Sequence, residues 1–515
     1  MSAERDHASM RLMLACALAM PSWGALAQVG PPDEGRSAGT ASDVQRISIP
    51  SPNYPYLIKD PLGARPSRLD SNTPLPGDAT AIDCSNPSEL PTRPLALADA
   101  VDLALCNSPQ VKVSWAAIKI QAAAVGQSRA TWLPTANATF SRLHSQTTYP
   151  SFSSSNTSSD GYTAFAGVTW RLFDFGARSA DNKSAARLLD AALANHDAAL
   201  EKTLGGVVQA YFDASTARAS VQSRGDATGY AEQTWKAAAR REAKGVSAAS
   251  DTLQARAALA KARLAEQRAI GDLHKAMSVL LYACGLPPQA EVQLAAEPES
   301  EPAQALSDLS NWLTMTAERH PAILAAQAQV ESAEAKVDVA RRQGLPSIDF
   351  SANYYRNGYP NQGLQPVGSS TKTVGITLNI PLFEGLARTY QVRSAQAQVD
   401  QSRAQLQDVR LQMASMVVKD HAEATAALSN LEASATWVEA ASAAVESARN
   451  RYDKGAGDVL ELLAAQSALS DARQERLRCL AEWRSARLRL FADSGTLGRS
   501  ELMRTPGSVP ESASQ

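Results

Sequence analysis

Apolar positions along this chain follow two different periods, and the two periods alternate in the same order in each half. Spacings of three or four residues predict helices, whereas apolar residues at every second position predict strands. The first half gives helices at 97–105 and 111–130, two strands within about 135–172, a long helix at 177–243 and a return helix at 250–283. The second half gives strands within about 347–382, a long helix at 387–453 and a return helix at 458–491. Each long helix has 67 residues and would extend roughly 100 Å.

Matching residues at near-constant spacing indicate that the two halves are a duplication. Pro109 corresponds to Pro321, at an offset of 212, and beyond the strands the offset becomes 210. The later matches are Leu172-Phe173-Asp174 with Leu382-Phe383-Glu384, Ala177-Arg178 with Ala387-Arg388, and Lys244-Gly245 with Lys454-Gly455. Proline is absent from 151–286 and from 382–505, which favours long helices because proline breaks them. We therefore expect one elongated duplicated domain, with repeats at 95–290 and 291–492.

The predicted strands have one apolar and one polar face. In the second half Ile348, Phe350, Ala352 and Tyr354 alternate with serine, aspartate and asparagine. Such alternation over about ten residues is typical of strands in a membrane barrel, although a soluble sheet with one covered face gives the same pattern. Behind the N-terminus no segment has the roughly 18 continuous apolar residues of a membrane-spanning helix. A membrane crossing would therefore have to use the strands.

The two ends of the chain differ in composition from the repeats. Arg5 and Arg11 precede an apolar run and the small residues Ala25-Leu26-Ala27, which predicts a signal peptide at 1–27; a short buried helix is the alternative. Residues 28–94 are rich in proline, serine, glycine and aspartate and predict an extended periplasmic arm. A flexible tail is predicted at 493–515.

Composition and motifs exclude several classes of function. The net charge is −2 with no basic stripe, which argues against nucleic acid as a partner. The six histidines are scattered and no catalytic or metal-binding motif is present, so we expect no enzyme activity and no cofactor. Cys84 lies in the arm and Cys106 ends the first short helix. A disulfide between them would fasten the arm to the body in an oxidising compartment; two buried free thiols are the alternative.

The strand count predicts an oligomer. Four strands cannot close a membrane barrel, because the smallest have about eight and an open sheet edge is not tolerated in lipid. Several copies of the chain must therefore share one barrel. The long helices have no globular core of their own and must pack side by side around the same axis, which gives a tube.

The duplicated order of elements, the strand-to-helix junctions at 172–178 and 382–388, and the glycine turns resemble the TolC family of outer-membrane channels over residues 95–492. The resemblance implies a mainly α fold with a β-barrel part. Three subunits, each with four strands, would form a 12-stranded trimeric barrel in the outer-membrane lipid of a Gram-negative cell. A long-helix α-barrel would continue through the periplasm. The implied partners are an inner-membrane ABC or proton-driven transporter and a periplasmic adaptor protein.

The resemblance also implies a gate at the periplasmic tip, where acidic side chains surround the constriction. Candidate gate residues lie beside the two tip turns and are Asp251, Tyr452, Asp458 and Glu461. The glycines expected to turn the chain are Gly245, Gly455 and Gly457. Acidic residues at helix starts also cap helices, which is the alternative role. From the spacing of glycine and acid, we expect the second turn to be three residues shorter than the first. It also lacks the basic residue with which some members of the family latch the tip.

Three functions remain open from the sequence. The arm with its Cys84/Cys106 pair resembles the branch of the family that serves type I secretion of cyclolysin-like (RTX) toxins, so protein export is the first hypothesis. The outer-membrane part of a tripartite small-molecule or multidrug efflux pump is the second. A non-transporting periplasmic coiled-coil scaffold is the third, and it would need no lipid-facing strands.

Overall fold

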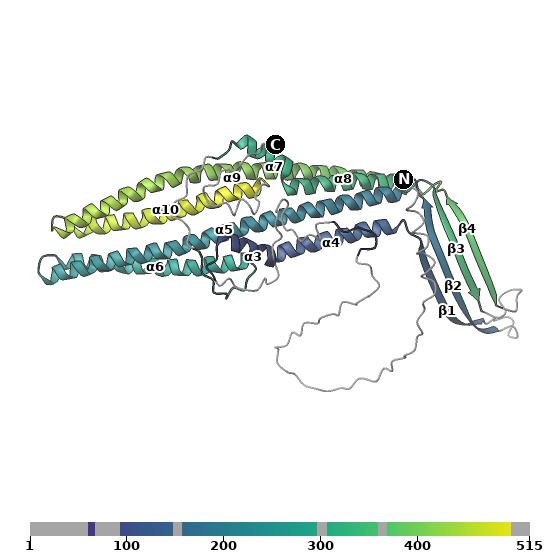
Figure 1. The fold of residues 1–515 in the computed structure, drawn as a ribbon, viewed down its shortest axis with the longest axis horizontal. Helices are drawn as coiled ribbons and strands as arrows, with labels where there is room; N and C mark the ends of the chain where they lie inside the picture. Colours follow the sequence, from purple (N-terminus) through teal and green to yellow (C-terminus); the bar gives the residue numbers. More distant parts are fainter. Residues whose placement is uncertain (1–59, 67–92, 148–156, 296–305, 359–367, 496–515) are drawn as a thin grey trace, which may run out of the picture. The chain divides into compact units, whose positions relative to one another are not determined.

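The computed structural model describes residues 60–66, 93–147, 157–295, 306–358 and 368–495 (Figure 1). The chain divides into the units Met1–Leu57 and Ile58–Gln515, and every described residue belongs to the second. The predicted signal peptide, most of the predicted arm with Cys84, and most of the predicted tail lie outside the described residues. Among the described helices, none combines the length and the apolar character that a membrane span needs.

The two halves of the described chain contain the same elements in the same order (Figure 1). The first half consists of α3 (Leu97–Asn107), α4 (Pro109–Ala130), β1 (Thr135–Thr147), β2 (Thr157–Phe173), α5 (Ala177–Ala243) and α6 (Ala249–Ala283). The second half consists of α7 (Leu309–Arg319), α8 (Pro321–Arg342), β3 (Ser347–Asn357), β4 (Ser369–Asn379), α9 (Ala387–Asp453) and α10 (Val459–Asp493). The duplicated, mainly helical fold predicted from the sequence is therefore present. β4 ends three residues before the predicted limit of 382, because Pro381 has no N–H for a strand ladder.

The four strands form one antiparallel sheet in the order β1-β2-β3-β4. The helices joined to these strands follow the same order, because α4 contacts α5, α5 contacts α8 and α8 contacts α9. At their other ends the long helices form two hairpins, α5 with α6 and α9 with α10, which meet where α10 contacts α5. Each half thus contributes two strands to the sheet and one hairpin of long helices to the helical part.

The strand register gives the sheet one apolar and one polar face. Paired residues share a face of an antiparallel sheet, and the pairs Ala136↔Val168, Val168↔Ala352 and Ala352↔Val374 continue across all four strands. Apolar side chains on this face are strongly exposed, with 72% exposure for Phe140 and Val374 and 68% for Ile376. The opposite face carries polar residues such as Asn137, Ser351, Asn353, Thr373 and Thr377.

Left-handed backbone turns join each second strand to its long helix. Phe175 and Gly176 have φ values of 52° and 88°, and Gly385 and Leu386, at the offset of 210, have φ values of 61° and 65°. Glycine adopts this conformation at little cost, whereas other residues are strained in it. Each junction therefore keeps one glycine, but in the opposite order within the pair.

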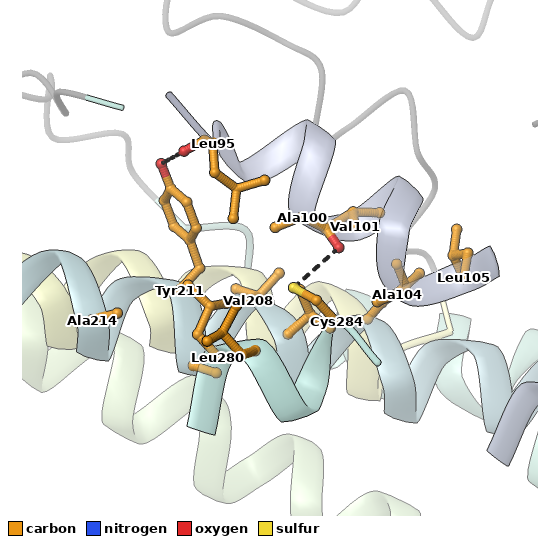
Figure 2. Packing of buried hydrophobic residues seen from close by; sticks show 14 of the residues in the cluster. Leu95, Ala100, Val101, Ala104, Leu105, Val208, Tyr211, Ala214, Leu280 and Cys284 are labelled. Carbon is orange, nitrogen blue, oxygen red and sulfur yellow. Dashed lines mark hydrogen bonds between the residues drawn. The ribbon is translucent and has the colours of Figure 1, made fainter. Parts of the chain in front are cut away.

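A buried cluster fixes the short helix α3 on the hairpin of α5 and α6 (Figure 2). Tyr211 of α5 donates a hydrogen bond to the Leu95 carbonyl over 3.3 Å, and the Cys284 Sγ donates to the Ala100 carbonyl over 3.7 Å. Burial raises the pKa of the Cys284 thiol to about 12, so it remains protonated. Cys106 at the end of α3 is disulfide-bonded. Its partner lies outside the described residues, and its pairing with Cys84 stays a prediction.

Candidate functional site

The two turns that join the long helices to the return helices have the same length and hydrogen bonds. Five residues, 244–248 and 454–458, separate the helices in each case. The N–H of Val246 donates to the Arg241 carbonyl and that of Gly245 to the Glu242 carbonyl, and Ala456 and Gly455 repeat these bonds in the second half. This is the Schellman motif at a helix C-terminus. The expectation of a shorter second turn is wrong, because the acidic residues used to measure it occupy different positions at the two helix starts.

The predicted tip glycines have distinct roles in these turns. Gly245 and Gly455 are left-handed, with φ values of 71° and 76°, as the Schellman motif requires. Gly457 avoids a steric clash instead, since a Cβ at this position would lie 3.0 Å from the Tyr452 backbone nitrogen and 3.1 Å from the Arg451 Cβ. The backbone of the second turn therefore passes close to the last turn of α9.

The acidic candidates all lie at helix starts, and the structure gives each of the three a partner. Asp458 caps α10 by accepting a hydrogen bond from the Leu460 N–H over 3.4 Å. Glu461, at the third position of α10, forms an ion pair with Arg451 at the end of α9. Asp251, at the third position of α6, corresponds to Glu461 through the offset of 210, and its carboxylate accepts from the Ser250 hydroxyl over 3.3 Å. Capping, the alternative role, therefore applies to Asp458.

Tyr452 joins the two helical hairpins near the tip. It is 6% exposed and packs against Ala448, Val459 and Leu462 of its own hairpin. From α5, the Arg241 guanidinium donates to the Tyr452 carbonyl over 2.9 Å and lies 4.5 Å from the centre of its ring. Such a cation–π contact contributes about 0.5–2 kcal/mol.

The sequence reasoning did not single out Arg241, which makes the contact between the two hairpins at the tip. The expected lack of a basic residue concerned the second turn, whereas Arg241 lies beside the first. A signal for it exists in the duplication, because Arg241 and Arg451 stand at the offset of 210 and hold equivalent places in the two turns. Arg451 stays within its own hairpin and pairs with Glu461, whereas Arg241 reaches the other hairpin. The sequence shows that the two arginines hold equivalent positions, but not that their side chains contact different hairpins.

Side-chain hydrogen bonds continue this contact along the seam between α5 and α10. The bonded pairs, all polar, are Ser220 with Gln474 at 2.7 Å, Arg224 with Ser470 at 3.1 Å, and Thr234 with Gln466 at 3.0 Å. Polar pairs lose little free energy on separation when water replaces the partner, because the net contribution of such a bond is only about 0.5–1.5 kcal/mol. The seam can therefore separate at lower cost than an apolar helix interface.

Among the described residues, no group of three or more histidine, cysteine, aspartate or glutamate side chains could hold a metal ion. The arrangement is instead that of a channel subunit: a sheet with an exposed apolar face, continued by two long helical hairpins whose turns carry carboxylates. The chain belongs to the outer membrane efflux protein family, whose sequence profile matches residues 100–286 and 312–496. The two matched segments coincide with the two halves of the duplication.

Individual relatives and solved structures agree with this assignment. The chain is 38% identical to protein CyaE of Bordetella pertussis over 411 residues, which is 79% of this chain and 85% of that protein. It is 25% identical to the alkaline protease secretion protein AprF of Pseudomonas aeruginosa over 428 residues, covering 79% and 86% of the two chains. The crystal structure of the outer membrane protein VceC from Vibrio cholerae superposes with a TM-score of 0.65 at 21% identity, over 78% of this chain and 96% of that one.

These comparisons confirm the predicted resemblance, fold class and location. The protein is an export channel of the Gram-negative outer membrane that extends into the periplasm. The family consists of channels rather than enzymes.

Proposed function

We propose that this channel is the outer-membrane component of a type I secretion system and exports a protein toxin of the cyclolysin (RTX) class. The observation that carries the proposal is the match to a named secretion protein, AprF, over 79% of the chain and 86% of that relative. The predicted arm with the Cys84/Cys106 pair supports the same branch of the family. Outer-membrane efflux of small molecules is the second candidate, and the family description favours it.

The proposed assembly is a homotrimer. One subunit has four strands, of which β1 and β4 are paired on one side only in the described sheet. An open edge would leave backbone groups unpaired in lipid, at a cost of several kcal/mol each. Three copies, with β4 of one beside β1 of the next, would close a 12-stranded barrel. An inner-membrane transporter and a periplasmic adaptor would complete the duct. The exposed apolar face disfavours a purely periplasmic scaffold.

Deletion of the gene tests the proposed cargo. We expect the deletion strain to lose one or a few secreted proteins from the medium while its sensitivity to drugs and dyes changes little. Mass spectrometry of the culture supernatant and drug susceptibility, both with a complemented strain, are the two measurements. An unchanged secreted proteome together with increased drug sensitivity would assign the channel to efflux instead.

We further propose that the tip forms the gate. Repeated by the threefold axis, Asp251, Asp458 and Glu461 would give carboxylate rings around a narrow opening. Such rings attract cations and bind multivalent cations strongly, because like charges in a narrow pore add to one potential. Tyr452, held by Arg241, would keep the hairpins together in the closed state. Gly245, Gly455 and Gly457 allow the tight turns on which this arrangement depends.

Two variants separate the charge of the gate from its closure. Asp458→Ala with Glu461→Ala should weaken block of the channel by divalent and trivalent cations by about tenfold or more, since two acidic rings are removed. Arg241→Ala keeps the carboxylates but removes the contact with Tyr452, so it should raise the conductance and retain the block. Single-channel recording in planar bilayers measures both properties. Unchanged block in the double variant would remove Asp458 and Glu461 from the gate.

A further inference from the structure

The apolar face of the sheet carries different side chains at its two ends: the end joined to the helices and the end where β1 leads into β2 and β3 into β4. Next to the helices this face carries Val168, Phe350, Ile376 and Leu378. Toward the other end it carries basic and aromatic side chains on all four strands. These are Phe140 and Arg142 on β1, Tyr162 on β2, Tyr354 and Arg356 on β3, and Lys372 on β4.

The register places the three basic residues on a diagonal across this face, from β1 to β4. Arg142 is paired with Tyr162, Arg356 with Ala164, and Lys372 with Tyr354. Along the strands, Arg356 lies one step of two residues, about 7 Å, from each of the other two, so Arg142 and Lys372 are about 14 Å apart in this direction. All three side chains are exposed. Because paired residues on neighbouring strands are only about 5 Å apart, long side chains from β3 and β4 can reach one ligand.

Aromatic rings support one arginine of this basic row, Arg356. The Arg356 guanidinium lies 5.9 Å from the centre of the Tyr162 ring, and that ring stacks on Phe140 with centroids 6.1 Å apart and planes 26° apart. A ring beneath a guanidinium covers one of its faces and leaves its N–H groups free to donate in the ring plane. Arg356 therefore presents its hydrogen-bond donors beside an apolar surface.

The charge on this face is unbalanced within the described strands. The acidic residue on the face is Asp160, whose carboxylate lies 2.9 Å from the His144 Nδ1. The row of Arg142, Arg356 and Lys372 has no ion pair of its own among the described residues. On the opposite face, by contrast, Arg171 is paired with Asp349 over 2.9 Å. The unpaired positive charge therefore lies on the side that faces lipid.

The location of the row within the membrane identifies its partner. The helices join the sheet at one end and extend into the periplasm, so the end with the basic row lies toward the outer leaflet. Basic residues at the level of the headgroups attract anionic lipid phosphates, and arginine donates to phosphate in a bidentate geometry. The ligand that fits both the donors and the apolar band below them is a phosphorylated lipid with its acyl chains along the sheet.

We propose that Arg142, Arg356 and Lys372, with Phe140, Tyr162 and Tyr354, form a binding site for the phosphate groups of lipid A in the outer leaflet. The site lies on the outside of the channel and is separate from the export path. It would fix the depth and the rotation of the sheet in an asymmetric membrane. The inference goes beyond export and depends on the outer-membrane location alone, whatever the cargo is.

The test uses the full-length channel purified in detergent and lipid A with two phosphates, one phosphate or none. Native mass spectrometry gives the affinity of each lipid for the protein. We expect the wild type to prefer the doubly phosphorylated form, and Arg142→Gln with Arg356→Gln and Lys372→Gln to weaken its binding by on the order of 100-fold, since each basic residue contributes about fivefold. Affinity for the phosphate-free lipid should change little.

A charge-matched control comes from the helices. Lys112→Gln, Lys119→Gln and Lys261→Gln remove three exposed charges from α4 and α6, and this variant should bind lipid A as the wild type does. Single-channel conductance should be unchanged in both triple variants, which verifies that they are folded. Equal binding of all three lipids by the wild type, or equal loss in the two variants, would overturn the proposal. Competition by inorganic phosphate at the same concentration as lipid A would contradict a lipid ligand.

Discussion

Replacing Arg178 by methionine should lower the free energy of unfolding of the channel by about 3–5 kcal/mol, because a buried carboxylate is left without its partner. The Arg178 Nε donates to Asp174 Oδ2 over 2.9 Å, and the two side chains are only 9% and 8% exposed. The matched variant Arg388→Met in the second half should cost about 1 kcal/mol. Its ion pair with Glu384 has a shorter distance, 2.6 Å, but the two side chains are 24% and 41% exposed.

The difference between the two arginines depends on the backbone carbonyls around them. Arg178 donates to the carbonyls of Thr131 and Arg171 over 3.1 and 2.8 Å, and its guanidinium lies 4.2 Å from the Trp132 ring centre. It thus joins the end of α4, the end of β2 and the start of α5. Arg388 has one such bond, to the Ala340 carbonyl over 3.4 Å.

Chemical denaturation of the purified channel in detergent, followed by circular dichroism, measures both variants. The expected ranking is wild type, Arg388→Met and then Arg178→Met, in order of falling stability. Asp174→Asn with Arg178→Met removes both charges and should recover part of the loss, since a neutral side chain is less costly to bury than a carboxylate. Equal destabilisation by the two single variants would contradict the role assigned to burial.

The sequence predicted these junctions as a pair but not their unequal burial. The repeat of Leu-Phe, an acidic residue and Ala-Arg placed both strand-to-helix connections correctly. The proline-free runs also indicated where the long helices α5 and α9 lie, because helix exclusion of proline is a local property. Burial depends on which helices pack nearby. The order of the left-handed pair also differs, with glycine second in the first junction, at Gly176, and first in the second, at Gly385.

At the tip, local signals were read correctly and a tertiary contact was missed. Gly245 and Gly455 were found because a helix that ends in a left-handed turn favours glycine there. The unequal turn lengths were an error of alignment, since Asp458 caps its helix while the equivalent position in the first half is Ala248. Arg241 contacts a residue 211 positions away in the sequence. No periodicity along one helix reveals such a contact.

Carboxylates gathered between α5, α9 and α10 make the stability of the channel depend on pH. Burial raises the pKa of Glu201 to about 8, with further contributions from the negative charges of Asp197 and Asp493. Burial also raises the pKa of Asp420 to about 7, where Asp493 again contributes through a hydrogen bond and its charge. Arg489 and Lys419 oppose the shift of Asp420 but do not cancel it.

The sign of the effect follows from the proton counts of the two states. Glu201 has its ordinary value of 4.5 in the unfolded chain and about 8 in the folded one. Between these values the folded state binds more protons than the unfolded state, so stability falls as the pH rises. The loss begins above about pH 4.5 and is complete above about pH 8. Asp420 adds a loss of the same sign between about pH 4 and 7.

Glu201→Gln should therefore stabilise the channel at pH 9 by on the order of 5 kcal/mol, because glutamine cannot ionise and each unit of the pKa shift from 4.5 to about 8 corresponds to about 1.4 kcal/mol. At pH 4.5 the variant and the wild type should differ little, since both side chains are then neutral. Denaturation curves in detergent from pH 4.5 to 9 measure this difference. Glu432→Gln, on an exposed position of α9, is the control and should leave the pH dependence of the wild type intact. A Glu201→Gln curve parallel to the wild type at every pH would show that Glu201 ionises normally in the folded channel.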